Sequence, residues 1–176
     1  ASKPDNWNVE VFTDVQSALE PWAALEANAA APLYATRRFA IPWLDTLGRS
    51  AGISPMIVLV RDAAGEPALL FPFGVRESNS IRRVEFLGGK DSNSNMGLFR
   101  PGFAATRNEL KDILRRAAGL SGLAPDAYTL SNQPECWEGK PNPLAILATQ
   151  PSPSFCHSAE LMADSEAFHK QQLSAD

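Results

Sequence analysis

Several residue types and patterns are scarce in this sequence, and each shortage excludes a class of protein. Two cysteines in 176 residues are too few for a disulfide-bonded scaffold, so we interpret Cys136 and Cys156 as free thiols, with a single bridge as the alternative. No window approaches the roughly 18 apolar residues of a membrane-spanning helix. No basic start followed by an apolar segment indicates a signal peptide, although a start at Ala1 leaves a processed leader open. We therefore expect a cytoplasmic protein without a membrane span.

Positive charge is also in short supply. Lys and Arg number 16 against 20 Asp and Glu, which gives a formal net charge of −4. Binding to nucleic acid or to an anionic membrane surface needs a clustered positive face, so neither partner is expected. The 44% of apolar residues and the 20% of charged residues are ordinary for a globular protein. The length suffices for one domain with a proper core and is too short for two comfortable ones.

The centre of the chain contains three apolar runs separated by turn residues. They are Met56–Val60, Ala68–Val75 and Arg83–Gly89, and Gly65 in the first turn can take the positive φ that a hairpin often needs. Such runs predict an antiparallel meander whose first two strands are well buried. Pro72 cannot donate a ladder hydrogen bond, so it predicts a bulge or a point where pairing stops.

Helical and strand patterns surround this centre. Asp14 and Thr106 are good N-caps for two amphipathic helices, one running from Val15 towards Ala29 until Pro32 ends it, the other covering Arg107–Leu120. The remaining expected elements are a strand at Val9–Phe12, a helical segment at Thr36–Gly48, short strands at Leu98–Phe99, Ala127–Leu130 and Ser158–Leu161, a loop at Pro134–Pro143, a short helix at Leu144–Leu147 and a helix at Ser165–Leu173 capped by Asp164. The fold class is therefore α+β, with a mixed, mainly antiparallel sheet of about five to seven strands flanked by helices.

Catalytic and metal-binding signatures are weak. Cys156, His157 and His169 could supply ligands or a nucleophile–base pair, but neighbours on a strand point to opposite faces, so we expect no metal site. The segment Arg116–Ser121 is superficially similar to the phosphate loop of acetyltransferases. That loop needs a strand before it and a helix after it, so that free amides meet the pyrophosphate. A helix precedes this segment, which favours a helix C-cap. Gly88-Gly89-Lys90 follows a strand, but no amphipathic helix opens directly after it.

Two further groups are candidates for ligand contacts. Asp91, Asn93 and Asn95 alternate as in a calcium loop, yet the required glycine and the distal glutamate are missing. A solvated turn that orders a pocket rim is the preferred interpretation. Arg37-Arg38 beside Phe39 and Trp43 could bind an anionic or sugar-like ligand by charge and stacking. The alternative is a helix with an aromatic core face and solvated arginines.

These segments together resemble a known family. The residues concerned are Trp22-x-x-Leu25, Phe39-x-x-x-Trp43, Pro55 to Arg61 with Gly65, Leu69 to Phe73 and Arg83 to Gly88. Their order is similar to the N-terminal half of the CelD/BcsL-type GNAT acetyltransferases, bacterial proteins linked to cellulose or exopolysaccharide production. The resemblance covers roughly residues 9–165 and rests on diffuse hydrophobic patterns. It implies a single GNAT-like domain over 9–165, with residues 166–176 starting a helix that leads to a second GNAT-like domain.

The resemblance also implies a role. Acyl-CoA would be the co-substrate of the parent enzyme, no cofactor is expected in this part, and no catalytic residue can be assigned. The domain would contribute to binding a small-molecule or sugar acceptor. Our candidates for substrate binding are Tyr34, Arg37, Trp43, Asp91, Asn93, Asn95 and Arg100. The alternative is a non-catalytic interaction or sugar-binding module in polysaccharide synthesis. A groove near Trp43 and Asn95 would favour the enzyme, and a contiguous exposed apolar patch the module.

Overall fold

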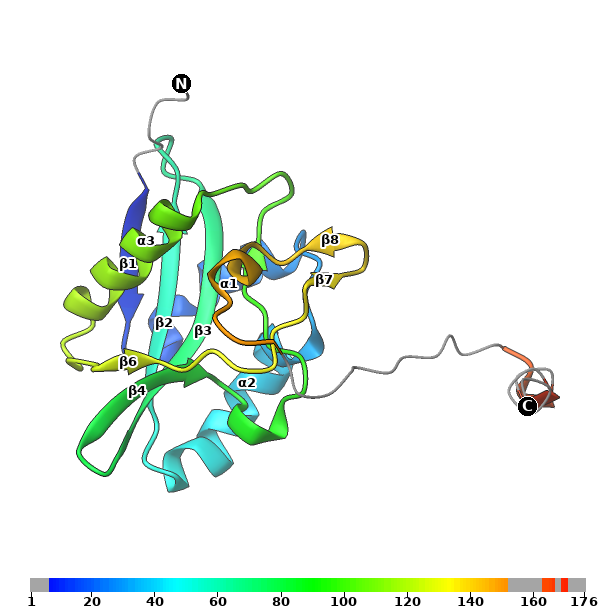
Figure 1. Cartoon of the computed structure of the whole chain (residues 1–176), viewed down its shortest axis with the longest axis horizontal. Helices are drawn as coiled ribbons and strands as arrows, with labels where there is room; N and C mark the ends of the chain where they lie inside the picture. Colours follow the sequence, from blue (N-terminus) through cyan, green and yellow to red (C-terminus); the bar gives the residue numbers. More distant parts are fainter. Residues whose placement is uncertain (1–6, 152–162, 167–168, 171–176) are drawn as a thin grey trace.

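The computed structural model describes residues 7–151, 163–166 and 169–170. A mixed, mainly antiparallel sheet with the strand order β1-β2-β3-β4-β6, in which β5 also pairs with β3, lies between helices (Figure 1). Helix α3 (Arg107–Leu120) crosses one face, and α1 (Val15–Glu26) and α2 (Arg37–Trp43) cover the other. The α+β class and the flanked, mainly antiparallel sheet expected from the sequence are confirmed.

The predicted meander is formed by β2 (Ser54–Arg61), β3 (Pro67–Ser78) and β4 (Ile81–Phe86), all paired antiparallel. The turn between β2 and β3 is ordered by Asp62, whose Oδ1 accepts hydrogen bonds from the amides of Ala64 at 2.9 Å and Glu66 at 3.0 Å. Gly65 has the positive φ, 85°, that this turn requires. Five consecutive residues of β2 and eight of β3 are buried, as expected of strands covered on both faces.

Pro72 lies where β3 changes its second neighbour. Its pairing with β2 continues opposite Ile57, and the irregularity in that ladder falls instead between Val60 and Arg61. On the other edge of β3, the pairing with β5 (Leu98–Phe99) ends at Leu70, and the pairing with β4 begins at Phe73. The missing amide of proline therefore falls between two partners and leaves no donor unpaired. The predicted bulge at Pro72 is wrong, and the predicted interruption of pairing applies to this edge alone.

The two outer strands differ in direction. β1 (Asn8–Phe12) runs antiparallel to β2, whereas β6 (Ala127–Tyr128) runs parallel to β4, with Arg83 opposite Ala127 and Val84 opposite Tyr128. The strand predicted at Ala127–Leu130 is therefore shorter than expected. After two residue pairs, β4 and the chain beyond β6 separate.

Alternating residues of the strands form two cores, one on each face. The α3 face contains Val58, Phe71, Phe73, Val84 and Phe86 with Leu110, Ile113 and Ala117 of the helix. The opposite face contains Ile57, Leu59 and Leu70 with Trp22, Leu25 and Leu44. Most of these side chains are less than a tenth exposed, and at about 25 cal/mol per Å² their burial is the main stabilising contribution to the fold.

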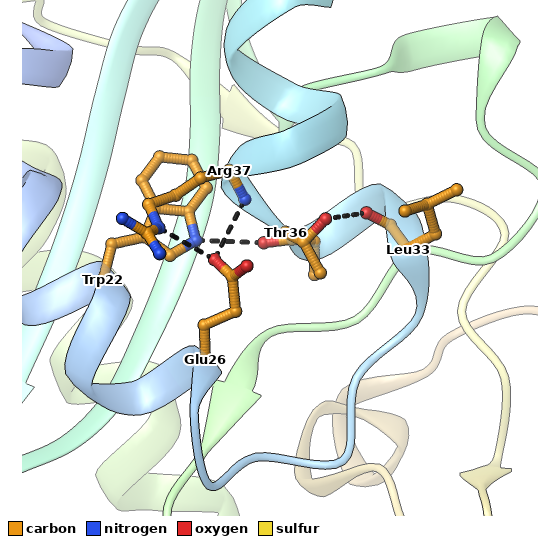
Figure 2. A network of polar contacts seen from close by, with 6 residues as sticks. Trp22, Glu26, Leu33, Thr36 and Arg37 are labelled. Carbon is orange, nitrogen blue, oxygen red and sulfur yellow. Dashed lines mark hydrogen bonds and ion pairs between the residues drawn. The ribbon is translucent and has the colours of Figure 1, made fainter.

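Helix α1 starts where predicted but ends earlier. Asp14 is its N-cap and accepts a hydrogen bond from the amide of Ser17, and Pro21 lies inside the helix. The helix stops at Glu26 rather than continuing to Pro32, and the Glu26 side chain binds the start of the next helix. One of its carboxylate oxygens accepts from the backbone amide of Arg37 at 3.1 Å and from Nε of Arg37 at 3.0 Å (Figure 2).

The connection between α1 and α2 is fixed by further polar contacts. Trp22 donates its indole N–H to the carbonyl of Ala35 at 3.1 Å within η1 (Leu33–Ala35), and the Thr36 hydroxyl donates to the carbonyl of Leu33 (Figure 2). Helix α2 continues into the π-helical turn η2 (Leu44–Gly48), so the predicted helical segment at Thr36–Gly48 is confirmed with a change of winding at its end.

The chain after β4 agrees with most expectations. The short turn η3 (Gly89–Asp91), β5 and α3 follow in order, and α3 has the complete capping box of Thr106 and Glu109. The loop predicted at Pro134–Pro143 is instead a small hairpin of β7 (Cys136–Trp137) and β8 (Lys140–Pro141), closed by a turn in which Glu138 and Gly139 have positive φ. Residues Pro143–Leu147 form the 3-10 turn η4, which confirms the short helix predicted there.

Some sequence expectations fall on residues outside the described ranges. They are the strand at Ser158–Leu161, the state of Cys156 and most of the helix at Ser165–Leu173. Cys136 is an exposed free thiol. Asp164 accepts a hydrogen bond from the amide of Glu166 at 2.9 Å, which is consistent with its predicted capping role.

Candidate functional site

The structure separates the seven candidate substrate-binding residues into four groups. Tyr34, Trp43 and Asp91 lie where α2 meets η3; Asn95 lies inside the loop before β5, with Asn93 exposed beside it; Arg37 lies at the start of α2; and Arg100 lies at the end of β5. The single groove expected from the sequence is not formed by all seven together.

The first group is an aromatic corner made by α2 and the glycines that follow β4. Tyr34 contacts the edge of Phe39 at a ring distance of 4.8 Å, and the indole N–H of Trp43 donates to Asp91 Oδ2 at 2.9 Å. A Cβ atom on Gly88, with a φ of 107°, would lie 3.1 Å from the Phe39 ring, so glycine allows this approach. Trp43 is 9% exposed, and its one polar group is already paired.

The second group is a buried polar network around Asn95, which corrects the expectation of a solvated turn at that position. Asn95 accepts from the Ser92 hydroxyl at 2.7 Å and donates its side-chain amide to the carbonyl of Ser131 at 3.1 Å. The backbone amide of Asn95 donates to the carbonyl of Asn132 at 2.7 Å, and the side-chain amide of Asn132 donates to the carbonyl of Ser92 at 2.9 Å. Ser92 is fully buried and Asn95 is 4% exposed, while Asp91 and Asn93 are exposed.

This network occupies the place where β4 and the chain after β6 separate. In open parallel sheets, ligands commonly bind where the carboxyl ends of neighbouring strands diverge. Here the backbone carbonyl of Ser92 and both amides of Asn95 are hydrogen-bonded to Ser131 and Asn132, and the Ser92 hydroxyl donates to Asn95. These polar groups are satisfied within the chain, so they are not available to a ligand.

The predicted cation Arg37 is also engaged. Its ion pair with Glu26 connects the two helices, and the side chain is 37% exposed. Its neighbour Arg38 is exposed and, within the part of the chain that the structure describes, forms no ion pair. Arg38 is therefore solvated, as the alternative interpretation of this helix predicts, whereas Arg37 is not, because Glu26 binds it.

Arg100 lines a half-open cavity of about 230 Å³ between three segments. Ala24 and Leu25 come from the last turn of α1 and Asn28 from the chain just after it. Glu66 comes from the β2–β3 turn, Pro67 is the first residue of β3, and Pro101 follows Arg100. Glu66 and Asn28 were not among the sequence candidates, because in sequence they look like ordinary turn and helix-end residues. Only the antiparallel pairing of β3 with β5 brings Arg100 beside that turn.

The guanidinium of Arg100 is oriented by Asp62. Its Nη1 lies 2.6 Å from Asp62 Oδ2, and its backbone amide donates to the carbonyl of Ala68 at 2.9 Å. The side-chain hydrogen bond from Arg100, followed by the amides of the turn, lowers the pKa of Asp62. Asp62 is therefore charged at neutral pH and holds one corner of the guanidinium, while the other donors of Arg100 are hydrogen-bonded to none of the described residues.

Other kinds of site receive no support from the described residues. Among residues 7–151, 163–166 and 169–170, no group of three His, Cys, Asp or Glu side chains could hold a metal ion. The Cys156 and His157 part of that hypothesis lies outside the described ranges. Gly88 and Gly89 lead into η3, a turn of three residues, so the amides of a long helix do not follow them. No described helix has the length and apolar character needed to cross a bilayer.

Comparisons of the chain with protein-family models, with curated proteins and with solved structures give no significant match. The functional interpretation therefore depends on the residues and their geometry.

Proposed function

We propose that this chain is the N-terminal, acceptor-side domain of a CelD/BcsL-like, acyl-CoA-dependent acyltransferase, a bacterial cytoplasmic enzyme of polysaccharide production. Its partner would be a second GNAT-like domain of the same protein. The order of elements supports this proposal: strand, two helices, three antiparallel strands, a helix, and a strand parallel to β4. That order is compatible with the GNAT-like fold that the sequence resembles.

The hydrogen-bonded network beside β4 is the observation on which the assignment of the two binding sites depends. An acyl-CoA site needs free amides for the pyrophosphate, supplied by a strand–loop–helix arrangement. In this chain β4 is followed by η3 and a loop whose amides and side chains bond to Ser131 and Asn132, and α3 begins only at Arg107. We therefore place acyl-CoA binding in the second domain and acceptor binding in this one.

The chemistry of the parent enzyme follows from acyl transfer. An amine or hydroxyl of the acceptor attacks the thioester carbonyl, the thiolate of coenzyme A leaves, and backbone amides stabilise the oxyanion. In the proposed arrangement this domain orients the acceptor, and the cavity at Arg100 offers the polar groups for it. Among the described residues, the exposed large apolar side chains lie on five different elements, which does not favour an interaction module. The cavity used here lies at Arg100 and not at the groove expected near Trp43 and Asn95, so the choice of an acyltransferase depends on the order of elements.

A thermal-melt titration of this chain with acetyl-CoA tests the proposal. We expect no saturable shift, whereas a ligand at about 100 times its dissociation constant would add roughly 2.7 kcal/mol and raise the melting temperature by a few degrees. A saturable shift would place an acyl-CoA site in this domain and contradict the proposed division. In the parent enzyme, Arg100→Gln is expected to raise KM for the acceptor and leave KM for acyl-CoA unchanged; the reverse pattern would also contradict it.

A further inference from the structure

The cavity at Arg100 combines opposite charges that do not neutralise each other. Arg100 and Glu66 both line it, yet no ion pair within 4.0 Å joins these two described residues. Glu66 is fixed through its backbone, since its amide donates to Asp62 and its carbonyl accepts from the amide of Asp62 at 3.0 Å. Its side chain is exposed and has no cationic partner among the described residues. The cavity thus presents one carboxylate and one guanidinium as separate groups.

The remaining donors of Arg100 suit a carboxylate. Asp62 accepts from Nη1 alone, so Nε and Nη2 are hydrogen-bonded to no other described residue. A guanidinium binds a carboxylate through two parallel N–H groups, and Asp62 fixes the plane in which they lie. Because the side chain is 39% exposed, a small ligand can reach these donors from solvent.

The same cavity also suits an ammonium group. Leu25 lies in the last turn of α1, where the helix dipole is negative and no residue is basic, and Asn28 follows two residues after the helix ends. The neighbouring guanidinium groups are paired with other carboxylates: Arg100 with Asp62, and Arg61, which also donates to the Gly65 carbonyl, with Glu10. The Glu66 carboxylate has no such partner among the described residues, so it attracts a cation.

The walls and the size restrict the ligand further. Ala24, Leu25, Pro67 and Pro101 supply apolar surface beside the charged groups. A volume of about 230 Å³ is smaller than the roughly 300–1,000 Å³ of pockets for drug-sized ligands or cofactors. A molecule such as acyl-CoA does not fit, but an aliphatic amino acid does.

We propose that the Arg100 cavity binds a small free α-amino acid with an aliphatic side chain. The carboxylate is bound by Nε and Nη2 of Arg100, the ammonium lies between Glu66 and the end of α1, and the side chain contacts Leu25 and the prolines. The inference names a ligand class for the cavity that the proposed function gives to the acceptor, and a role of the amino acid as acceptor rests on that function. Its binding is measured without acyl-CoA, so it holds or fails whatever the acetyl-CoA titration shows.

Two-dimensional ¹⁵N NMR of the chain, titrated with L-valine, is the test. We expect saturable shifts concentrated at Asn28, Glu66 and Arg100. N-acetyl-L-valine, which has no ammonium, and L-valinamide, which has no carboxylate, should each bind about fivefold more weakly or worse. The absence of a saturable shift, shifts centred elsewhere, or equal binding of all three compounds would overturn the proposal.

Variants separate the two charged contacts from folding effects. Glu66→Gln keeps the size of an exposed side chain and should weaken the binding of L-valine about fivefold. The same variant should reduce the binding of L-valinamide and leave the binding of N-acetyl-L-valine unchanged. Arg100→Lys keeps the positive charge beside Asp62 but loses the two parallel N–H groups of the guanidinium, so it should weaken the binding of both L-valine and N-acetyl-L-valine. The matched controls Glu77→Gln and Arg107→Lys change exposed residues on β3 and α3 and should leave binding unchanged. Equal weakening by the controls, or none by the two cavity variants, would overturn the proposal.

Discussion

At the scale of single residues, Asn93 and Asn95 differ in burial and in hydrogen bonding although they are only two positions apart. Asn93 is exposed, and Asn95 is 4% exposed with both ends of its side-chain amide bonded. Removing a buried partner leaves polar groups unsatisfied, which costs more than the hydrogen bond itself contributes. The sequence pattern of alternating polar residues contains no signal that separates the two positions.

We expect Asn95→Ala to destabilise the protein by about 2 kcal/mol, since the carbonyl of Ser131 and the hydroxyl of Ser92 lose their partner. Asn93→Ala is the matched control and should change the free energy of unfolding by less than about 0.5 kcal/mol. Urea unfolding followed by circular dichroism measures both. Similar values for the two variants would mean that the network contributes nothing beyond a solvated loop.

Asp62 predicts a pH dependence of stability. The pKa of Asp62 is lower in the folded protein than in the unfolded chain, mainly because of the hydrogen bond from Arg100. Asp62 therefore makes its full contribution to the free energy of unfolding above its unfolded-state pKa of about 4, and this contribution is lost as the pH falls through the pKa of the folded state. Asp62→Asn should flatten the fall in stability below about pH 4. Arg100→Gln should also flatten this fall in stability, and the double variant should flatten it little more than either single variant. Unfolding curves measured at a series of pH values give the answer, and unchanged slopes in both single variants would refute this role of the pair.

At the scale of elements, glycine decides how closely β5 approaches β3. A Cβ atom on Gly97 would lie 2.6 Å from a ring carbon of Phe71 and 3.1 Å from the carbonyl oxygen of Leu70. Phe71 is fully buried between the sheet and α3, so it cannot move aside freely. The short strand β5, and with it the position of Arg100, depends on this contact.

Gly97→Ala is therefore expected to destabilise the protein by about 1–3 kcal/mol through overpacking. Gly119→Ala, in the last turn of α3 with open space around it, should instead stabilise it by up to about 1 kcal/mol, because alanine is the better helix former. Thermal unfolding of the two variants compares the same chemical change in two surroundings. A neutral Gly97→Ala would show that β5 can shift without loss.

The elements show where sequence reasoning succeeds and where it fails. Helix α3 is predicted residue for residue, because its apolar spacing, capping box and polar outer face are all local signals. The early end of α1 and the β7–β8 hairpin were not predicted. The first is accompanied by a contact that is not local, the ion pair of Glu26 with Arg37 eleven positions away, and the second contains positive φ angles at Glu138 and Gly139. The candidate site is predictable only at Arg100, since Glu66 and Asn28 join it through the pairing of β3 with β5.

At the scale of the whole molecule, β2 and β3 belong to both cores. Successive side chains of β3, such as Leu70 and Phe71, enter opposite faces, so neither face can lose its packing while the other keeps its sheet. The tryptophans divide evenly: Trp7 and Trp137 pack on the α3 face, and Trp22 and Trp43 on the other.

We expect the described domain to unfold in one cooperative step. Two variants provide a fluorescence probe for each face: Trp22→Phe with Trp43→Phe keeps the α3-face tryptophans, and Trp7→Phe with Trp137→Phe keeps the others. Within each variant, denaturant curves from fluorescence and from far-ultraviolet circular dichroism should have the same midpoint. An earlier fluorescence transition in either variant would indicate that one face melts separately.

The arrangement of β3 also determines how this chain can diverge. Pro67–Ser78 borders β2 along one edge and β5 and β4 in succession along the other, so this one strand contributes to three interfaces. Distant relatives should therefore tolerate proline at position 72, where the backbone amide has no strand partner. They should also keep a small residue at position 74, where a Cβ atom would lie 2.5 Å from Ile53. A saturation library of the whole gene would accordingly yield its fewest tolerated variants on this strand.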